Sequence, residues 1–119
     1  MRCPGGTPLS ESELQHKILL ALGLRDDLIV WRSNAGVAFR PDGSAVQFGK
    51  VGQADITGII KGGRRLEIEV KRPAWSAQRP GRQSAVQRIF QRNIEKMGGL
   101  YILAYSVEDV INALPDAPQ

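Results

Sequence analysis

Three charged side chains between residues 55 and 71 have the types and spacing needed to hydrolyse a phosphate ester. Asp55 is followed, after thirteen residues, by Glu69, and Lys71 comes two positions later. Two carboxylates about 4 Å apart repel each other by about 4 kcal/mol at an effective dielectric constant near 20, so such a pair needs a cation. Oxygen ligands from one or two carboxylates suit Mg²⁺ or Mn²⁺ better than zinc. The Lys71 ammonium could then hold a water molecule or a phosphate oxygen.

The residues between these side chains predict how they meet. Residues 56–60 are mostly apolar, two glycines then form a tight reversal, and residues 66–71 alternate apolar with charged side chains. Strict alternation predicts a strand with one buried face, which puts Glu69 and Lys71 on the same side. If the two runs pair as a hairpin, the beginning of the first lies beside the end of the second. We therefore expect Asp55 to lie near the other two groups.

The composition bounds the class of protein. A chain of 119 residues that is 42% hydrophobic and 24% charged has the length and balance of one globular domain with a modest core. It has neither an apolar run of membrane-spanning length nor a secretory signal, so we expect a cytoplasmic location. Cys3 and His16 are the only residues of their types, which excludes an intrachain disulfide and a thiolate zinc site.

The positive charge is concentrated in one part of the chain. Residues 61–96 contain ten Lys or Arg against three Glu, whereas the remainder has six basic and nine acidic residues. The basic part contains Glu69 and Lys71. A polyanion such as nucleic acid is the natural partner of such a segment, although a solvated basic surface would have the same composition.

A helix is expected before the strands. Residues 1–9 contain two prolines and two glycines and predict an irregular arm. Ser10 and Glu13 have the spacing of a capping box, so a helix should begin there and run to Gly23. Glu11 falls on the apolar face of this helix, whereas Glu13 points elsewhere. Glu11 either lies at the edge of the core in water or points into the site, and Glu13 competes with it for that role.

Short strands should follow this helix. Residues 28–32, 37–40 and 45–48 are short apolar runs, and a proline-containing turn separates the last two. A polar segment after the first run either contacts a phosphate backbone or only connects two strands. Its candidate contact residues are Arg32, Ser33 and Asn34.

Residues 72–82 predict a loop, because they contain two prolines and show no periodicity. An aromatic ring in this loop could stack on a base while guanidinium groups bind phosphates. Trp75 could equally cover the core. The candidate nucleic-acid contacts here and in the following helix are Arg72, Trp75, Arg79, Arg82 and Arg88.

A second helix should begin at Ser84 and end at two glycines, residues 98 and 99. Gln87 has the position that completes a capping box with Ser84, and the cap alone would explain it. The apolar face expected to be buried consists of Val86, Ile89, Phe90, Ile94 and Met97.

The last elements complete the fold class. Residues 100–104 predict a buried strand, residues 106–114 a short helix that ends at Pro115, and residues 115–119 a tail. The order of elements predicts an α/β fold, a small mixed central sheet flanked by helices.

Together these motifs resemble the PD-(D/E)XK nuclease superfamily, and the surrounding pattern is similar to its VRR-NUC branch, the virus-type replication-repair nucleases. The match extends from about Glu11 to Leu114. It departs from the superfamily name at residue 54, where alanine replaces proline. The motifs are the helix glutamate Glu11, the Gly-x-x-Asp turn from Gly52 to Asp55, the strand end Glu69-Val70-Lys71, the helix start from Ser84 to Gln87, and Gly98-Gly99 followed by Tyr101.

The resemblance implies a restriction-endonuclease-like αβββαβ core within residues 10–114 and a Mg²⁺- or Mn²⁺-dependent hydrolase of DNA phosphodiester bonds. In this family's pattern Asp55 and Glu69 bind the metal, and the Val70 carbonyl is a further ligand. Lys71 orients the attacking water and offsets charge on the phosphate. Glu11 contributes through water or a second metal, and Gln87 positions Lys71 or the nucleophile.

The resemblance also implies a substrate. Small stand-alone members resemble Holliday-junction resolvases, which act as homodimers because a twofold dimer supplies two sites for two symmetric cuts. We therefore expect a structure-selective endonuclease for branched DNA. The resemblance further implies a bacterial or phage-infected cell. The alternatives are a nuclease of flaps or duplex DNA and a nucleic-acid-binding module without catalytic activity.

Overall fold

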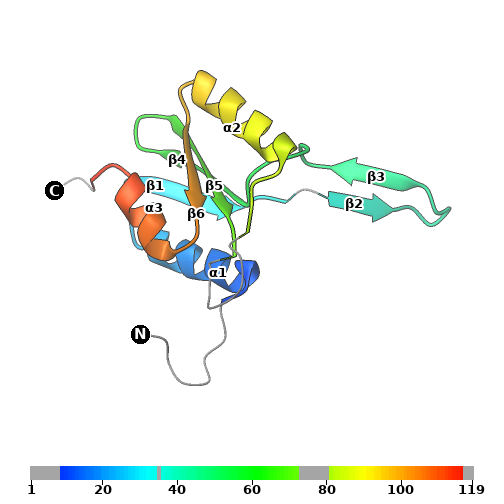
Figure 1. The fold of residues 1–119 in the computed structure, drawn as a ribbon, viewed down its shortest axis with the longest axis horizontal. Coiled ribbons are helices and arrows are strands. Elements are labelled where there is room, and N and C mark those ends of the chain that lie inside the picture. Colours follow the sequence, from blue (N-terminus) through cyan, green and yellow to red (C-terminus); the bar gives the residue numbers. More distant parts are fainter. Residues whose placement is uncertain (1–8, 35, 73–80, 117–119) are drawn as a thin grey trace.

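The computed structural model describes residues 9–34, 36–72 and 81–116 of the chain. In these residues three helices accompany a mixed sheet of four strands and a separate ribbon of two strands, which makes the fold α/β (Figure 1). The elements are α1 (Glu11–Leu22), β1 (Leu28–Arg32), β2 (Gly36–Phe39), β3 (Ala45–Phe48), β4 (Ile56–Ile60), β5 (Arg64–Val70), α2 (Ala85–Lys96), β6 (Leu100–Ala104) and α3 (Val107–Ala113).

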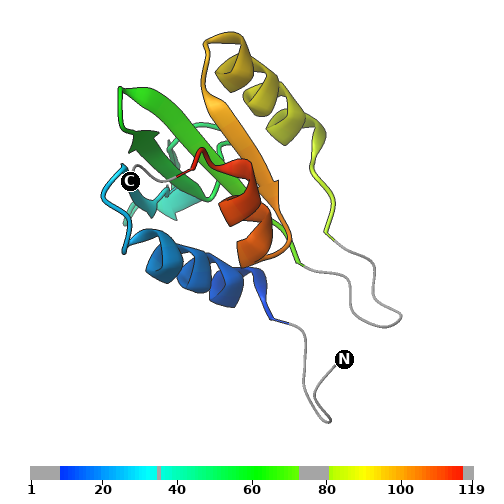
Figure 2. The ribbon, with the colours of Figure 1, turned by 90° about the vertical axis from the view of Figure 1, so that its left-hand side faces the viewer.

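The sheet has the strand order β1-β4-β5-β6. β4 is antiparallel to β1 and β5, whereas β5 and β6 are parallel and α2 belongs to the connection between them. Helices α1 and α3 lie together on one face of the sheet, and α2 lies on the other (Figures 1 and 2). This arrangement leaves β5 in the interior of the sheet with a helix layer on each side.

The predicted hairpin is confirmed. β4 and β5 pair with Ile56 opposite Ile68 and Ile60 opposite Arg64, and the reversal lies between them. Gly62 and Gly63 have φ of 100° and 92°, which only glycine adopts readily. The pairing brings the residue before β4 beside the end of β5, as the hairpin argument required.

The main core lies between the sheet and the pair α1 and α3. Leu14 and Ile18 of α1 are 2% and 0% exposed, and they pack with β4, β5 and β6 and with Val110 of α3. Burying such side chains fully contributes about 1.5–3 kcal/mol each. The sheet residues of this core include Ile56, Leu66, Ile68, Val70 and Ile102.

The prediction that β5 has only one buried face is wrong. Its alternating glutamates are buried as deeply as its apolar residues, because β5 is an interior strand and its second face is also covered. Glu67 is 1% exposed and accepts hydrogen bonds from the Thr57 hydroxyl and from Arg65 Nε, the latter at 2.7 Å. Alternation of charge therefore marks a polar buried face here, on which Glu67 has one partner in β4 and one in β5 itself.

The strands predicted at residues 37–40 and 45–48 exist but do not join the central sheet. β2 and β3 pair only with each other, from Gly36 opposite Phe48 to Phe39 opposite Ala45. The turn between them has Gly43 at φ 89°. Figure 1 shows this ribbon projecting from the body of the protein beside the first turn of α2. With four residues in each strand, the ribbon has too little apolar surface to build a core of its own.

The helix ends agree with the sequence, whereas the burial of α2 does not. Capping boxes are formed by Ser10 with Glu13 and by Ser84 with Gln87. Of the apolar face predicted for α2, Phe90 is buried and Ile94 is partly buried. The other three members, Val86, Ile89 and Met97, are 46%, 52% and 82% exposed, because α2 contacts the sheet mainly over β6. In the described part of the chain, no helix has the length and apolarity to cross a membrane.

Candidate active site

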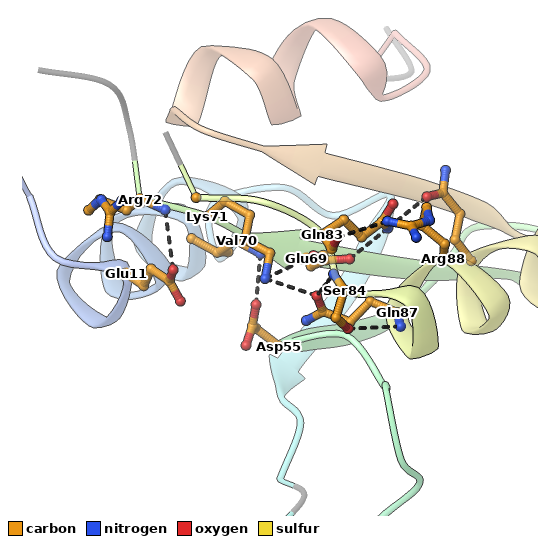
Figure 3. A network of polar contacts seen from close by, with 12 residues as sticks. Glu11, Asp55, Glu69, Val70, Lys71, Arg72, Gln83, Ser84, Gln87 and Arg88 are labelled. Carbon is orange, nitrogen blue, oxygen red and sulfur yellow. Dashed lines mark hydrogen bonds and ion pairs between the residues drawn. The ribbon is translucent and has the colours of Figure 1, made fainter. Parts of the chain in front are cut away.

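Asp55, Glu69, Lys71 and Gln87 come together where the beginning of β4, the end of β5 and the first turn of α2 meet (Figure 3). The β4–β5 hairpin brings Asp55 beside Glu69. The connection through α2 brings Gln87 to Lys71. The four side chains therefore come from three parts of the chain, with Glu69 and Lys71 both at the end of β5.

Asp55 is held by its backbone and by its side chain. Its N–H donates to the Ile68 carbonyl at 3.1 Å, and its carbonyl accepts from the Ser33 N–H at 2.8 Å. Its carboxylate Oδ2 accepts from the Val70 N–H at 2.7 Å. The side chain thus bonds to β5 just beyond the last backbone pair of the hairpin, Ile56 opposite Ile68. Gly52 starts this turn with φ 80°, and a Cβ there would lie 2.6 Å from the Val86 carbonyl oxygen.

Burial raises the pKa of the Asp55 carboxyl above its usual value. The hydrogen bond from Val70 opposes this shift, whereas the nearby negative charges of Glu11 and Glu69 add to it and Lys71 offsets part of it. Three acidic side chains thus act on one another at this end of the sheet. A bound cation would favour the ionised form of Asp55.

Glu69 is completely buried, and its two carboxylate oxygens have different surroundings. Oε1 accepts hydrogen bonds from the Tyr101 hydroxyl and from Gln83 Nε2, the latter at 2.9 Å. Among the described residues, none donates a hydrogen bond to Oε2. Its charged neighbour is the Lys71 ammonium, at 3.3 Å. A buried carboxylate oxygen without a hydrogen bond is costly, and it points to a group that would bind there.

Lys71 follows β5 directly, and its ammonium lies between two partners. Nζ is 3.3 Å from Glu69 Oε2 and donates to Gln87 Oε1 at 2.9 Å. The same Gln87 oxygen accepts from the Ser84 N–H at 2.8 Å. Gln87 therefore caps α2 and contacts Lys71 at once, so the cap does not exclude a place in the site.

Of the two helix glutamates, Glu11 faces the site. Its Oε2 accepts from the Arg72 N–H at 3.3 Å, and its charge acts on Asp55. Glu13 is held in the cap by Ser10, and these hydrogen bonds lower its pKa. The geometry thus separates two residues that the sequence pattern left in competition, and Figure 3 shows Glu11 at the margin of the cluster.

Tyr101 and Gln83 are further functional candidates: the sequence singled out Tyr101 only as a motif residue of the resemblance, without a role, and Gln83 not at all. Burial and the hydrogen bond to Glu69 raise the pKa of the Tyr101 hydroxyl, which keeps it a proton donor. Gln83 also donates to Gln91 Oε1 at 2.8 Å, and its own carbonyl accepts from Arg88 Nη1 at 3.0 Å. The available signal was one tyrosine within the otherwise apolar segment of residues 100–104.

The predicted nucleic-acid contacts are divided. Arg82 lines the same cleft as Lys71 and Gln87, whereas Arg32 lines a groove against α1. Ser33 Oγ and the Asn34 carbonyl accept from Gln53 Nε2, so this segment braces the turn before Asp55. Arg72 contacts Glu11 through its backbone, and Arg88 holds Gln83. Trp75 and Arg79 lie outside the described residues.

Within residues 9–34, 36–72 and 81–116, no cluster of three or more His, Cys, Asp or Glu side chains forms a metal site by itself. The donors at hand are the Asp55 carboxylate and Glu69 Oε2, beside the backbone of Val70. Two carboxylates with a carbonyl fit a hard cation such as Mg²⁺, which keeps several water ligands in proteins. The donor set is compatible with Mg²⁺ or Mn²⁺ and unsuited to a closed zinc site.

Fold and site together define an α/β protein with a buried carboxylate and lysine centre at the end of an interior strand. Comparison of the chain with protein-family models, with curated proteins and with solved structures finds no match. The function is therefore argued from the site itself.

Proposed function

We propose that this protein is a metal-dependent endonuclease that hydrolyses phosphodiester bonds in DNA. The observation that carries the proposal is Glu69 Oε2, a buried carboxylate oxygen that accepts no hydrogen bond from the described residues. This buried carboxylate has one oxygen fixed by two hydrogen bonds and the other directed at Lys71, with Asp55 beside it. Such an arrangement is costly for stability, because a buried carboxylate oxygen lacks a hydrogen bond. The neighbouring Asp55 has its pKa raised by burial, and shifts of this kind are common at functional sites.

The residues that would hold Mg²⁺ or Mn²⁺ are Asp55, Glu69 and the Val70 carbonyl. When bound, such an ion supplies charge neutralisation at the phosphate and lowers the pKa of a coordinated water. Tyr101 and Gln83 fix the orientation of the Glu69 carboxylate. Glu11 adds negative charge at the margin of the cluster, where it would act through water or a second ion.

Lys71 would orient the attacking water and stabilise charge that develops on the phosphate. Its ammonium is held by Gln87 on one side and by Glu69 on the other, so it is positioned before substrate arrives. Preorganised charge of this kind contributes because it needs no reorganisation during the reaction. Gln87 is then a positioning residue, since it acts on the substrate through Lys71.

DNA is the proposed substrate, because the basic part of the chain, residues 61–96, contains Glu69, Lys71 and Gln87 of the site. Branched DNA such as a Holliday junction, cut by a homodimer, is the form that the resemblance favours. The exposed apolar residues of α2 give a second copy a surface on which to pack. They are Ile89 and Met97.

Cleavage assays test the proposal directly. Purified protein is incubated with a four-way junction, a flap and a linear duplex of matched sequence, in Mg²⁺, in Mn²⁺ and in EDTA. We expect metal-dependent cleavage, fastest on the junction, and a loss of about 100-fold to 1,000-fold in Lys71→Ala. Lys61→Ala, in the reversal at the far end of the β4–β5 hairpin, is the matched control and should cut normally. No cleavage of any substrate, or full activity in Lys71→Ala, would reject the proposal.

A nucleic-acid-binding module is the second candidate, favoured by one observation. Lys71 already neutralises Glu69 at 3.3 Å, so the cluster has an internal cation. Calorimetric titration with Mn²⁺ separates the two functions. A nuclease site should bind the ion more weakly in Asp55→Ala than in the wild type, whereas a structural cluster should bind it equally poorly in both.

A further inference from the structure

A cleft of about 450 Å³ separates the root of the β2–β3 ribbon from the first turn of α2. Lys71 and Gln87 belong to its lining, so the cleft adjoins the candidate active site. The volume falls within the range of about 300–1,000 Å³ typical of small-molecule sites. None of the roles assigned above uses the ribbon side of this cleft.

The lining has two kinds of surface. One is apolar, and its side chains are half exposed: Val37 at 56%, Phe48 at 44%, Val51 at 55% and Val86 at 46%. The other is cationic and consists of Lys50, Lys71 and Arg82, and none of the described residues that line the cleft carries a carboxylate. A ligand with a flat apolar face and negative charge matches both surfaces.

The walls of the cleft are fixed by close packing. A Cβ added to Gly36 would lie 3.0 Å from the Phe48 ring, so the ring rests on this glycine. The Lys50 N–H donates to Gln53 Oε1 at 2.7 Å. The positive φ of Gly52 lets this turn pass close to the Val86 carbonyl. The ribbon root is thus held against α2, although the rest of the ribbon projects away.

We propose that this cleft binds one unpaired nucleotide next to the cleaved phosphate, with its base on Phe48 and Val86 and its backbone at Lys50 and Arg82. The inference rests on the proposed nuclease function and specifies its substrate. Bases in a duplex are covered by their neighbours, so only a nucleotide at a branch, a flap or an end offers a free face. Selection for branched DNA then follows from the cleft.

Binding measurements without divalent metal test the cleft independently of cleavage. Fluorescence anisotropy is recorded for wild type and Phe48→Ala with a splayed-arm DNA and with a fully paired duplex of equal length. We expect Phe48→Ala to weaken splayed-arm binding about tenfold, which is the typical scale for one base stacked on an aromatic ring, and to leave duplex binding within about twofold. Phe48→Leu keeps the apolar bulk, should fold normally by circular dichroism, and should lose the same selectivity. Phe39→Ala, on the same ribbon but outside the cleft, should bind both DNAs normally.

Abasic substitution identifies the nucleotide. In the splayed-arm DNA each position beside the branch is replaced in turn by an abasic unit. At one position the wild type should lose about tenfold in affinity, whereas the Phe48 variants should lose nothing further there. Additive losses, or equal weakening of duplex and splayed-arm binding, would overturn the inference.

The possible results distinguish the nucleotide site in the cleft from the proposed nuclease function. If both Phe48 variants cut branched DNA with unchanged selectivity, the nuclease function is supported and the nucleotide site in the cleft is rejected. If the abasic position and the Phe48 variants weaken binding non-additively but the protein cuts no DNA, the nucleotide site is supported and the nuclease function is rejected. Dissociation of a dimer by Phe48→Leu in light scattering, with DNA affinity unchanged, would assign the cleft to contact between two copies and overturn the inference. No binding to any DNA would overturn both.

Discussion

At the scale of single residues, the site is organised around Glu69, a carboxylate with no exposure to solvent. Its two oxygens are distinguished by the groups that contact them, since Tyr101 and Gln83 share Oε1 and Lys71 faces Oε2. A carboxylate held in this way has few orientations. If Glu69 holds the proposed cation, Tyr101 and Gln83 matter to the site because they orient this carboxylate.

Tyr101→Phe should reduce both metal affinity and turnover about tenfold to 100-fold, because the carboxylate loses the hydroxyl that orients it. KM for DNA should change little. Calorimetric titration with Mn²⁺ and steady-state kinetics measure the two effects. The matched control is Tyr105→Phe, which removes a hydroxyl that donates to the Gly81 carbonyl at 3.1 Å and does not contact Glu69. Equal losses in the two variants would show that the effect is general destabilisation.

Asp55 makes the stability of the metal-free protein depend on pH. Because burial raises its folded-state pKa, the contribution of this group to stability is fully present below the unfolded value, near 3.8, and is lost as the pH rises through the folded value. The Asp55→Asn side chain cannot ionise, so the variant does not lose stability as the pH rises, and its amide oxygen can still accept the hydrogen bond from the Val70 N–H. At neutral pH in EDTA its Tm should therefore exceed that of the wild type.

Thermal melts across the pH range check this sign. The difference in Tm between Asp55→Asn and the wild type should vanish below about pH 4, where the wild-type carboxyl is protonated. Saturating Mg²⁺ should raise the Tm of the wild type and have little effect on the variant. A variant that melts below the wild type at neutral pH would show that the carboxylate stabilises the fold even without a cation.

At the scale of elements, the pairing of β4 with β1 depends on close approach between the two strands. A Cβ on Gly58 of β4 would lie 2.2 Å from the Ile29 carbonyl oxygen and 2.7 Å from Val30 Cγ1. Gly58→Ala should therefore disturb the pairing of β1 with β4 and lower the free energy of unfolding by about 1–3 kcal/mol or more. Urea denaturation measures this change. Ile59→Val, at the next and exposed position, should stay within about 0.5 kcal/mol of the wild type.

The same elements show why part of the fold was predictable. The β4–β5 hairpin and the capping boxes are encoded by residues close in sequence, such as the Gly62-Gly63 reversal and the pair Ser84 and Gln87. The separate ribbon was not predictable, because the runs at 37–40 and 45–48 look the same whether they join a sheet or leave it. Burial of both faces of β5 was missed because it depends on where α2 packs.

The candidate site divides in the same way. The hairpin argument was sufficient to bring Asp55 beside the end of β5. The contacts of Tyr101 and Gln83 with Glu69 were not predictable, since they arise from the parallel connection through α2, and local patterns do not specify how such a connection packs. For Gln87 the sequence predicted both a cap and, through the resemblance alone, a position beside Lys71. Its cap is a local pattern, whereas its contact with Lys71 joins two elements.

At the scale of the whole molecule, the protein has extents of 50 × 43 × 25 Å, and the ribbon projects at one side (Figure 1). Lys50, Lys71 and Arg82 line the cleft between the root of the ribbon and the first turn of α2. Other cations of the basic segment lie elsewhere: Lys61 follows β4, at the far end of the hairpin from Asp55. The net charge of +4 is therefore less informative than the position of each cation relative to the site.

Salt dependence measures which of these cations contact DNA. Each phosphate contact adds about −0.9 to the slope of log K against log salt concentration for duplex DNA, and about −0.7 for a single strand. Arg82→Gln should therefore reduce the steepness of this slope by about 0.7–0.9 on a splayed-arm DNA. Lys61→Gln removes an equal charge at the far end of the hairpin and should leave the slope unchanged. If both variants reduced the slope equally, DNA would be held by the general positive field of the protein, and the cleft would have no special part in binding the backbone.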